Sequence, residues 1–132
     1  MIKEEKDLLL KDLCARLPYG VHVEYKGNIY DVLGISHGRL ILCKPFMSQT
    51  LEYCPLVEEV KPYLFPMSSM TEEQEMELDK LNPEFYSLIC EDGSRYVSMD
   101  GNTFDWFNAN HFDYRGLIEK GLVIDATGLN IY

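Results

Sequence analysis

The sequence predicts an α+β fold: an N-terminal helix, a small antiparallel SH3-like barrel or curled sheet, and then short helices with a β-hairpin. Three features of the sequence support the prediction. Residues 21–45 alternate apolar and polar side chains with the period of two that half-buried strands show, and glycines separate the alternating runs. Residues 3–17 repeat apolar side chains at helical spacing, and Thr71 with Gln74 forms the signature of a helix N-terminus.

Length and composition are those of one domain. The 132 residues are 46% hydrophobic, and a chain of this length buries roughly two-thirds of its unfolded surface. We expect a single domain over residues 1–132, in which a helix and β-meander part (1–66) precedes an acidic helix and hairpin part (67–132). No apolar run approaches the roughly 20 residues that span a bilayer, and the N-terminal residues lack a signal-peptide pattern. We therefore expect a cytoplasmic protein with no membrane contact.

The N-terminal helix is expected to lie on a sheet, because its apolar stripe is narrow and one-sided. Six positions form this stripe: Lys6, Leu9, Leu10, Leu13, Cys14 and Leu17. Pro18 cannot continue the helix. The cysteines of the chain lack the paired spacing of a zinc site, so we expect them to be buried thiols in a reducing compartment: Cys14, Cys43, Cys54 and Cys90.

Strands are expected to follow the helix as an antiparallel meander. The runs that form it are rich in β-branched and aromatic side chains: Val21–Tyr25, Ile29–Ile35 and Leu40–Cys43. Gly27 and Gly38 lie in the turns between them. His22 projects from the polar face of the first strand and His37 lies at a turn tip, so both are expected to be surface histidines without a partner.

The middle of the chain is expected to complete the sheet and begin the helical part. Residues 56–61 are expected to form a strand, because nearby prolines exclude a long helix: Pro55, Pro62 and Pro66. A helix capped by Thr71 runs to Leu81 and carries five acidic side chains. Asp92-Gly93 then predicts a hairpin between residues 85 and 99.

Residues 102–125 hold the only tryptophan and the densest mixture of polar side chains, so a site is expected here. A first helix, capped by Asn102 or Thr103, is expected to present a core-facing stripe of three residues: Phe104, Phe107 and His111. Interface hot spots are enriched in Trp, Tyr and Arg. The candidate binding residues are therefore Trp106, His111, Tyr114 and Arg115. Phe107 and Leu117 are expected in the core, and Trp106 is expected to be partly buried as a packing anchor.

Asp113 has two interpretations. It can cap a second helix from Tyr114 to Lys120, in which case Asp113→Ala costs about 1 kcal/mol and Asp113→Asn much less. Alternatively, His111 and Asp113 can bind a metal or perform acid–base chemistry in a small enzyme. No phosphate-binding loop, nucleophile motif or zinc motif accompanies the pair, so we expect no catalytic residue, no metal and no cofactor.

The net charge of −10 is unevenly distributed, because residues 1–47 carry +1 and residues 48–132 carry −11. An acidic chain is a poor binder of the phosphate backbone, so nucleic acid is not an expected partner. The charge suits cationic partners. An acidic decoy that imitates DNA is a further alternative, which requires acids spaced like phosphates on one face.

Runs along the whole chain resemble a family of small proteins from gut bacteria and their phages or prophages. The runs are residues 11–20, 61–73 and 106–122, and the last contains His111-Phe112-Asp113-Tyr114-Arg115-Gly116. The family has no known activity, so the resemblance implies a phage-associated origin and no particular chemistry. The sequence thus predicts a non-enzymatic interaction or accessory module with a protein partner.

Overall fold

The computed structural model describes residues 1–45, 53–82 and 101–132 of the chain. The predicted hairpin at residues 85–99 and Cys90 lie outside the described residues. Within them the chain combines helices with a mixed sheet, which confirms the α+β class. No helix among the described residues has the length and apolar character needed to cross a membrane.

The first helix, α1 (Lys3–Arg16), forms as expected and ends in a 3₁₀ turn, η1 (Leu17–Tyr19), at Pro18. Leu9 and Leu13 are fully buried and pack in the main core beside the sheet, so the predicted orientation of the helix is confirmed. The expectation of buried cysteines is wrong for two of them. Cys14 lies on the solvent side of α1 and Cys54 lies in a connecting segment, and both are exposed, whereas Cys43 is buried.

The predicted meander is confirmed as three antiparallel strands: β1 (His22–Tyr25), β2 (Asn28–Ser36) and β3 (Arg39–Cys43). The strand expected at residues 56–61 is wrong in its position. Val57–Glu59 instead forms a 3₁₀ turn, η2, because the Glu59 carboxylate accepts a hydrogen bond from the Leu56 amide at 2.7 Å. The strand β4 (Lys61–Pro66) begins after this turn.

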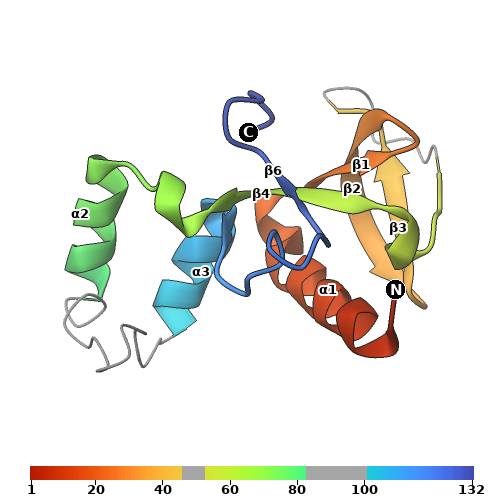
Figure 1. Cartoon of the computed structure of the whole chain (residues 1–132), viewed down its shortest axis with the longest axis horizontal. Helices are drawn as coiled ribbons and strands as arrows, with labels where there is room; N and C mark the ends of the chain where they lie inside the picture. The colour runs from red at the N-terminus through yellow and green to blue at the C-terminus, as the bar shows by residue number, and fades with distance from the viewer. Residues whose placement is uncertain (46–52, 83–100) are drawn as a thin grey trace.

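The strand β4 joins the two parts of the molecule. It runs across the middle of Figure 1, with α1 and the meander on one side and the remaining helices on the other. The strand order is β3-β2-β1-β4-β5, and β6 also pairs with β4. Pairing with β1 is antiparallel, whereas pairing with β5 (Phe112–Asp113) and β6 (Ile124–Asp125) is parallel. The described strands therefore form a curled mixed sheet with β3 and β5 at its two ends.

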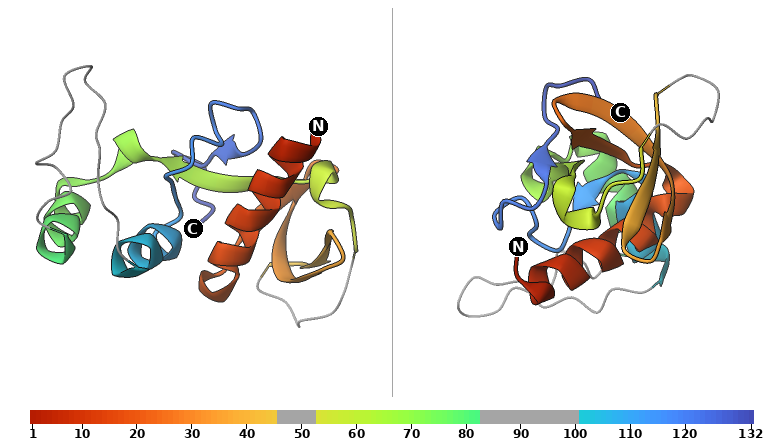
Figure 2. Two further views of the ribbon diagram at one scale, coloured as in Figure 1. Left: turned by 90° about the horizontal axis from the view of Figure 1, so that it is seen from below. Right: turned by 90° about the vertical axis from the view of Figure 1, so that its right-hand side faces the viewer.

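Among the described residues, α2 and α3 follow β4, and the left view of Figure 2 shows α3 between α2 and α1. The 3₁₀ turn η3 (Met67–Ser69) leads into α2 (Glu72–Leu81), which has the predicted capping box: the Gln74 amide donates to Thr71 Oγ1 at 3.2 Å, and the Thr71 amide donates to Gln74 Oε1 at 2.9 Å. The helix α3 spans Gly101–Ala109.

The helix expected from Tyr114 to Lys120 does not form. Residues 114–121 make turns instead, in which Gly116 and Gly121 have positive φ angles of 72° and 73°. Asp113 lies in β5 and is no helix cap. The predicted stripe on the preceding helix is also wrong at both ends, because Phe104 is exposed and His111 lies beyond the end of α3.

Two apolar clusters make up the core of the described residues. The larger contains α1, the meander and β4, and it also takes Leu117, Leu122 and Val123 from the second half of the chain. The smaller consists of Leu78, Phe107 and Phe112 with partly buried neighbours. Phe107 and Leu117 are both fully buried, as the sequence predicts. Core residues thus cross the expected division at residue 66.

Candidate functional site

The four candidate binding residues come from α3 and from the segments on either side of β5. Trp106 lies on α3, His111 lies between α3 and β5, and Tyr114 and Arg115 follow β5 directly. All four are partly buried. They do not form one surface. They belong to three groups of contacts arranged around Phe112.

A buried ion pair on α1 organises the first group. Asp12 and Arg16 are both fully buried and lie one helical turn apart. Arg16 donates from Nε to Asp12 Oδ2 at 2.8 Å and from Nη2 to Asp12 Oδ1 at 3.1 Å. Arg16 Nη2 also donates to the Phe112 carbonyl oxygen at 2.6 Å. These bonds tie α1 to β5, although the buried Arg16 Nη1 has no hydrogen-bond partner among the described residues.

Tyr114 and Arg115 complete this arrangement and are not free binding groups. Arg115 donates from Nε to Asp12 Oδ1 at 3.0 Å and from Nη2 to the Tyr114 hydroxyl at 3.1 Å. The Tyr114 hydroxyl donates to Asn108 Oδ1 at 3.0 Å, which connects the group to α3. The guanidinium carbons of Arg16 and Arg115 lie 5.2 and 4.9 Å from the centre of the Tyr114 ring. Such cation–π contacts stabilise the fold.

Trp106 belongs to the second group and packs as an anchor. Its ring stacks on Phe112 with centroids 5.8 Å apart and an interplanar angle of 17°, and it meets the edge of Phe107 at 5.5 Å. Its indole Nε1 donates to Glu77 Oε2 on α2 at 3.3 Å. Trp106 is partly buried, as the sequence predicts, but it packs between α3 and α2 and not against a helix after Asp113.

His111 forms the third group with Tyr132. Its backbone has a φ of 61°, and its imidazole stacks on the Tyr132 ring with centroids 3.5 Å apart and an interplanar angle of 10°. Burial lowers the pKa of His111 to about 4, and the positive charge of Arg16 contributes in the same direction. Its Nδ1 is buried and has no hydrogen-bond partner in the described part of the chain. His111 is therefore neutral near pH 7.

His111 and Asp113 do not form the pair that an enzyme would need. Both carboxylate oxygens of Asp113 accept backbone hydrogen bonds, from the Leu117 amide and from the Ile118 amide, each at 2.9 Å. Asp113 is 7% exposed, and its carboxylate holds the turn that follows β5. It does not orient the imidazole, so the geometry does not favour acid–base chemistry at these two residues.

His22 is placed differently from the sequence expectation, which made it a surface histidine without a partner. It is partly buried, its Nδ1 contacts Asp31 Oδ1, and its ring lies 4.9 Å from the Tyr132 ring. His22 and Asp31 are directly opposite each other across β1 and β2. The hairpin turn at Gly27 could have revealed this pair, because the turn fixes the register of both strands. Tyr132 carries no comparable local signal.

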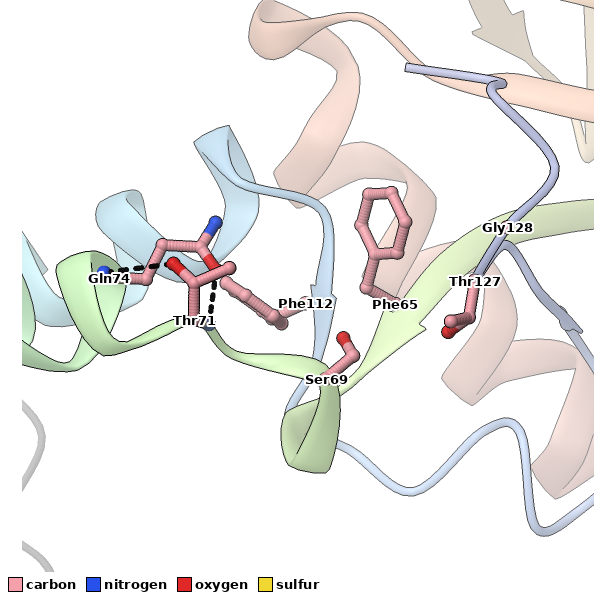
Figure 3. Close-up of a pocket in the computed structure, with 7 residues that line it drawn as sticks. All are labelled: Phe65, Ser69, Thr71, Gln74, Phe112, Thr127 and Gly128. Atoms are coloured by element: carbon pink, nitrogen blue, oxygen red, sulfur yellow. Dashed lines mark hydrogen bonds between the residues drawn. The ribbon is translucent and has the colours of Figure 1, made fainter.

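A pocket of about 230 Å³ lies beside these groups, where β4, α2 and the segment after β6 meet (Figure 3). Phe65 and Phe112 give it aromatic walls. Its polar side chains are bonded within the protein: Ser69 donates to the Pro66 carbonyl oxygen at 2.7 Å, the Thr71 and Gln74 side chains bond to each other's backbone amides, and Thr127 donates to Asp125 at 2.6 Å. The pocket offers shape and apolar contact but no reactive group.

The helix α2 provides an exposed, acidic surface. Leu78 is its one buried residue, and its acids are exposed: Glu72, Glu73, Glu75, Glu77 and Asp79. Met76 and Leu81 are also exposed, at 62% and 36%. Figure 1 places this helix at one end of the molecule, beside α3. Across residues 1–45, 53–82 and 101–132, no group of three potential metal ligands comes together.

Comparison with known proteins found no similar protein. Neither a family model, nor a curated protein, nor a solved structure matches it.

Proposed function

We propose that the protein is a non-enzymatic interaction module of the cytoplasm, an accessory protein of phage or prophage origin that binds a basic partner protein through α2. The resemblance of three runs of the chain to small proteins of gut bacteria and their phages supports this origin. The net charge of −10 supports a basic protein partner over nucleic acid.

The exposure of α2 is the observation that carries the proposal. A helix of ten residues is too short to be stable by itself in water, and a surface helix normally buries a continuous apolar stripe. This helix buries Leu78 and leaves Met76 exposed among acids. Flexible methionine side chains are frequent at binding surfaces, and charge complementarity steers association. A basic surface with an apolar contact point would complement this face.

The distribution of the acids favours a protein partner over imitation of DNA. At 100° per residue, Glu72, Glu75 and Asp79 line one side of α2, whereas Glu73 and Glu77 lie on the opposite side. A single row of acids spaced like phosphates does not result. The enzyme alternative is weakened by the Asp113 carboxylate, which is occupied by two backbone amides.

A charge-reversal experiment with a matched control tests the proposal. Glu75→Lys with Asp79→Lys changes the exposed face of α2, and Glu4→Lys with Asp7→Lys makes the same charge change on the exposed side of α1. The tagged wild-type protein is incubated with host lysate, cross-linked and analysed by mass spectrometry, and the affinity of the captured protein is then measured with each variant.

The α2 variant is expected to bind the captured protein about tenfold more weakly or worse, because like charges then face each other. The α1 variant is expected to bind as the wild type does, and both are expected to keep their thermal stability. Equal loss in both variants, or in neither, contradicts the proposal. Competition by duplex DNA for the same protein would instead favour the decoy alternative.

A further inference from the structure

The hydroxyl of Tyr132 occupies a place in the sheet between β1 and β4. The register of these strands pairs Glu24 with Lys61 and Val23 with Pro62, so it continues to His22 and Tyr63. There the two backbones are bridged by a side chain. The His22 amide donates to Tyr132 Oη at 3.1 Å, and Tyr132 Oη donates to the Tyr63 carbonyl oxygen at 2.8 Å.

The ring of Tyr132 lies among three other rings. His111 stacks on it at 3.5 Å, His22 lies at 4.9 Å and Phe65 at 5.9 Å, each measured between ring centroids. Burial raises the pKa of the Tyr132 hydroxyl to about 12, although the residue as a whole is 38% exposed. The hydroxyl end is therefore enclosed while part of the ring faces solvent. We call the surroundings of this ring, formed by His22, Tyr63, Phe65 and His111, the phenol slot.

The segment that carries Tyr132 is held mainly by this side chain. Residues 127–130 are exposed, and Gly128 and Asn130 have positive φ angles of 76° and 53°. A backbone hydrogen bond from the Ala126 amide to the Leu64 carbonyl oxygen at 2.8 Å fixes the start of the segment. Beyond it, Thr127 and Gly128 line the pocket beside Phe65, and the hydrogen bonds of Tyr132 attach residue 132 to β1 and β4. Few buried contacts and an exposed backbone are the marks of a segment that opens locally at low cost.

The chemistry of the slot selects a phenol. Its group must accept a hydrogen bond from an amide and donate one to a carbonyl, which a hydroxyl does and a carboxylate or an indole N–H does not. The stacked imidazole and the neighbouring rings require a flat aromatic body behind that hydroxyl. A phenylalanine side chain meets the second requirement and fails the first.

We propose that the phenol slot is a binding site for an exposed tyrosine side chain of a partner peptide, and that Tyr132 fills it from within the chain. Release of residues 127–132 makes the slot accessible. This site is separate from the α2 surface, so the two proposals can fail independently.

Chemical rescue with p-cresol, the side chain of tyrosine, tests the proposal on the full chain. Tyr132→Ala is expected to lower the melting temperature by several degrees, as the loss of buried contacts does in a domain of this size. Millimolar p-cresol is expected to restore it in a saturable manner, since a ligand of so few atoms binds weakly. The amide signal of His22 in ¹H–¹⁵N spectra is expected to shift along the same titration curve.

Matched controls distinguish a site that recognises the phenol hydroxyl from a nonspecific apolar cavity. Toluene, which lacks the hydroxyl, is expected to give a much smaller rescue. Wild-type protein is expected to bind p-cresol more weakly than Tyr132→Ala does, because Tyr132 must first leave the slot. Tyr132→Phe keeps the ring, so it is expected to resist p-cresol while the His22 amide exchanges faster with solvent. Equal effects of toluene and p-cresol on Tyr132→Ala, or a wild-type His22 amide signal that p-cresol does not shift at any soluble concentration, overturn the proposal.

The proposal can still be tested if the Tyr132→Ala protein does not fold without p-cresol. The variant is then refolded with p-cresol at increasing millimolar concentration. Recovery of the native ¹H–¹⁵N spectrum supports the slot. Failure to recover it at any soluble concentration, together with unchanged His22 amide exchange in Tyr132→Phe, overturns it.

Discussion

At the scale of single residues, His111 makes the stability of the protein depend on pH. Burial lowers its pKa from 6.5 to about 4, so between these values the unfolded chain binds a proton that the folded protein excludes. This contribution to stability is intact above pH 6.5 and is lost as the pH falls toward 4. Arg16, His22 and Tyr132 surround the imidazole and remain in place in the comparison below.

The first prediction compares wild type with His111→Asn by urea denaturation at pH values above 6.5 and near 4. Asparagine tolerates the φ of 61° at this position and does not titrate, so the variant is expected to lose less stability on acidification. Carboxylates titrate equally in both proteins. The difference between the two proteins in how much unfolding free energy they lose on acidification is therefore the contribution of His111. Identical losses would show that this imidazole does not govern the acid response.

Asp113 supports a second prediction, which differs from the one its sequence position suggests. As a helix cap it would tolerate asparagine, but in the structure both its oxygens accept amide hydrogen bonds. Asp113→Ala leaves both amides without an acceptor and is expected to cost about 3 kcal/mol. Asp113→Asn places an NH₂ group against one of the two backbone amides. It is expected to lower the free energy of unfolding by more than half of the alanine effect. A nearly neutral asparagine variant in thermal unfolding would contradict this account.

At the scale of elements, α1 is attached to the segment after β5 through one carboxylate. Asp12 accepts hydrogen bonds from both Arg16 and Arg115, and removing it leaves a fully buried guanidinium without its counter-ion. Asp12→Ala is therefore expected to destabilise the protein by about 3–5 kcal/mol. Asp7→Ala, on the exposed side of the same helix, serves as control and is expected to change stability by less than about 0.5 kcal/mol. Equal effects would exclude the buried network as the cause.

The pair of helices α2 and α3 is held by the ring of Trp106. Trp106→Ala removes its stacking on Phe112 and its bond to Glu77, and it is expected to cost about 3 kcal/mol. Glu77→Gln weakens the hydrogen bond alone and is expected to cost less than 1 kcal/mol, a value of the order of one exposed polar contact. Circular dichroism during urea denaturation measures both. An alanine variant of full stability that no longer binds a partner would place Trp106 in a binding surface instead.

At the scale of the whole molecule, local sequence signals predicted most helices and strands. They missed the features that depend on contacts between residues far apart in the sequence. The period of the meander and the Thr71 capping box act within a few positions, and both were right. The segment after Asp113 has helical spacing, yet Arg115 reaches back 103 positions to Asp12 and the local helix is lost. Packing of Trp106 could be foreseen from its neighbours. The grouping of His22, His111 and Tyr132 could not, because it depends on how β1 meets β4.

Because β4 carries residues of both apolar clusters, the molecule is expected to unfold as one unit. Leu64 is fully buried in the larger cluster, and its neighbour Phe65 packs on the smaller one. Leu64→Ala is expected to lower the free energy of unfolding by about 2–5 kcal/mol. The unfolding curves recorded by Trp106 fluorescence and by far-ultraviolet circular dichroism are expected to shift to the same midpoint. Two separate midpoints would indicate independent subdomains on either side of residue 66.

The parallel pairing of β4 with β6 has a consequence for the order of events on the ribosome. Residues 63 and 64 in the middle of the sheet receive their partner only when residues 124 and 125 have been synthesised. Until then a buried strand lacks a neighbour on that side, and contacts between residues so far apart in sequence form slowly. The nascent chain therefore holds an incomplete sheet while the residues between these two strands are synthesised. The acids of α2 are synthesised before residues 124 and 125, so the nascent chain carries these charges over that interval.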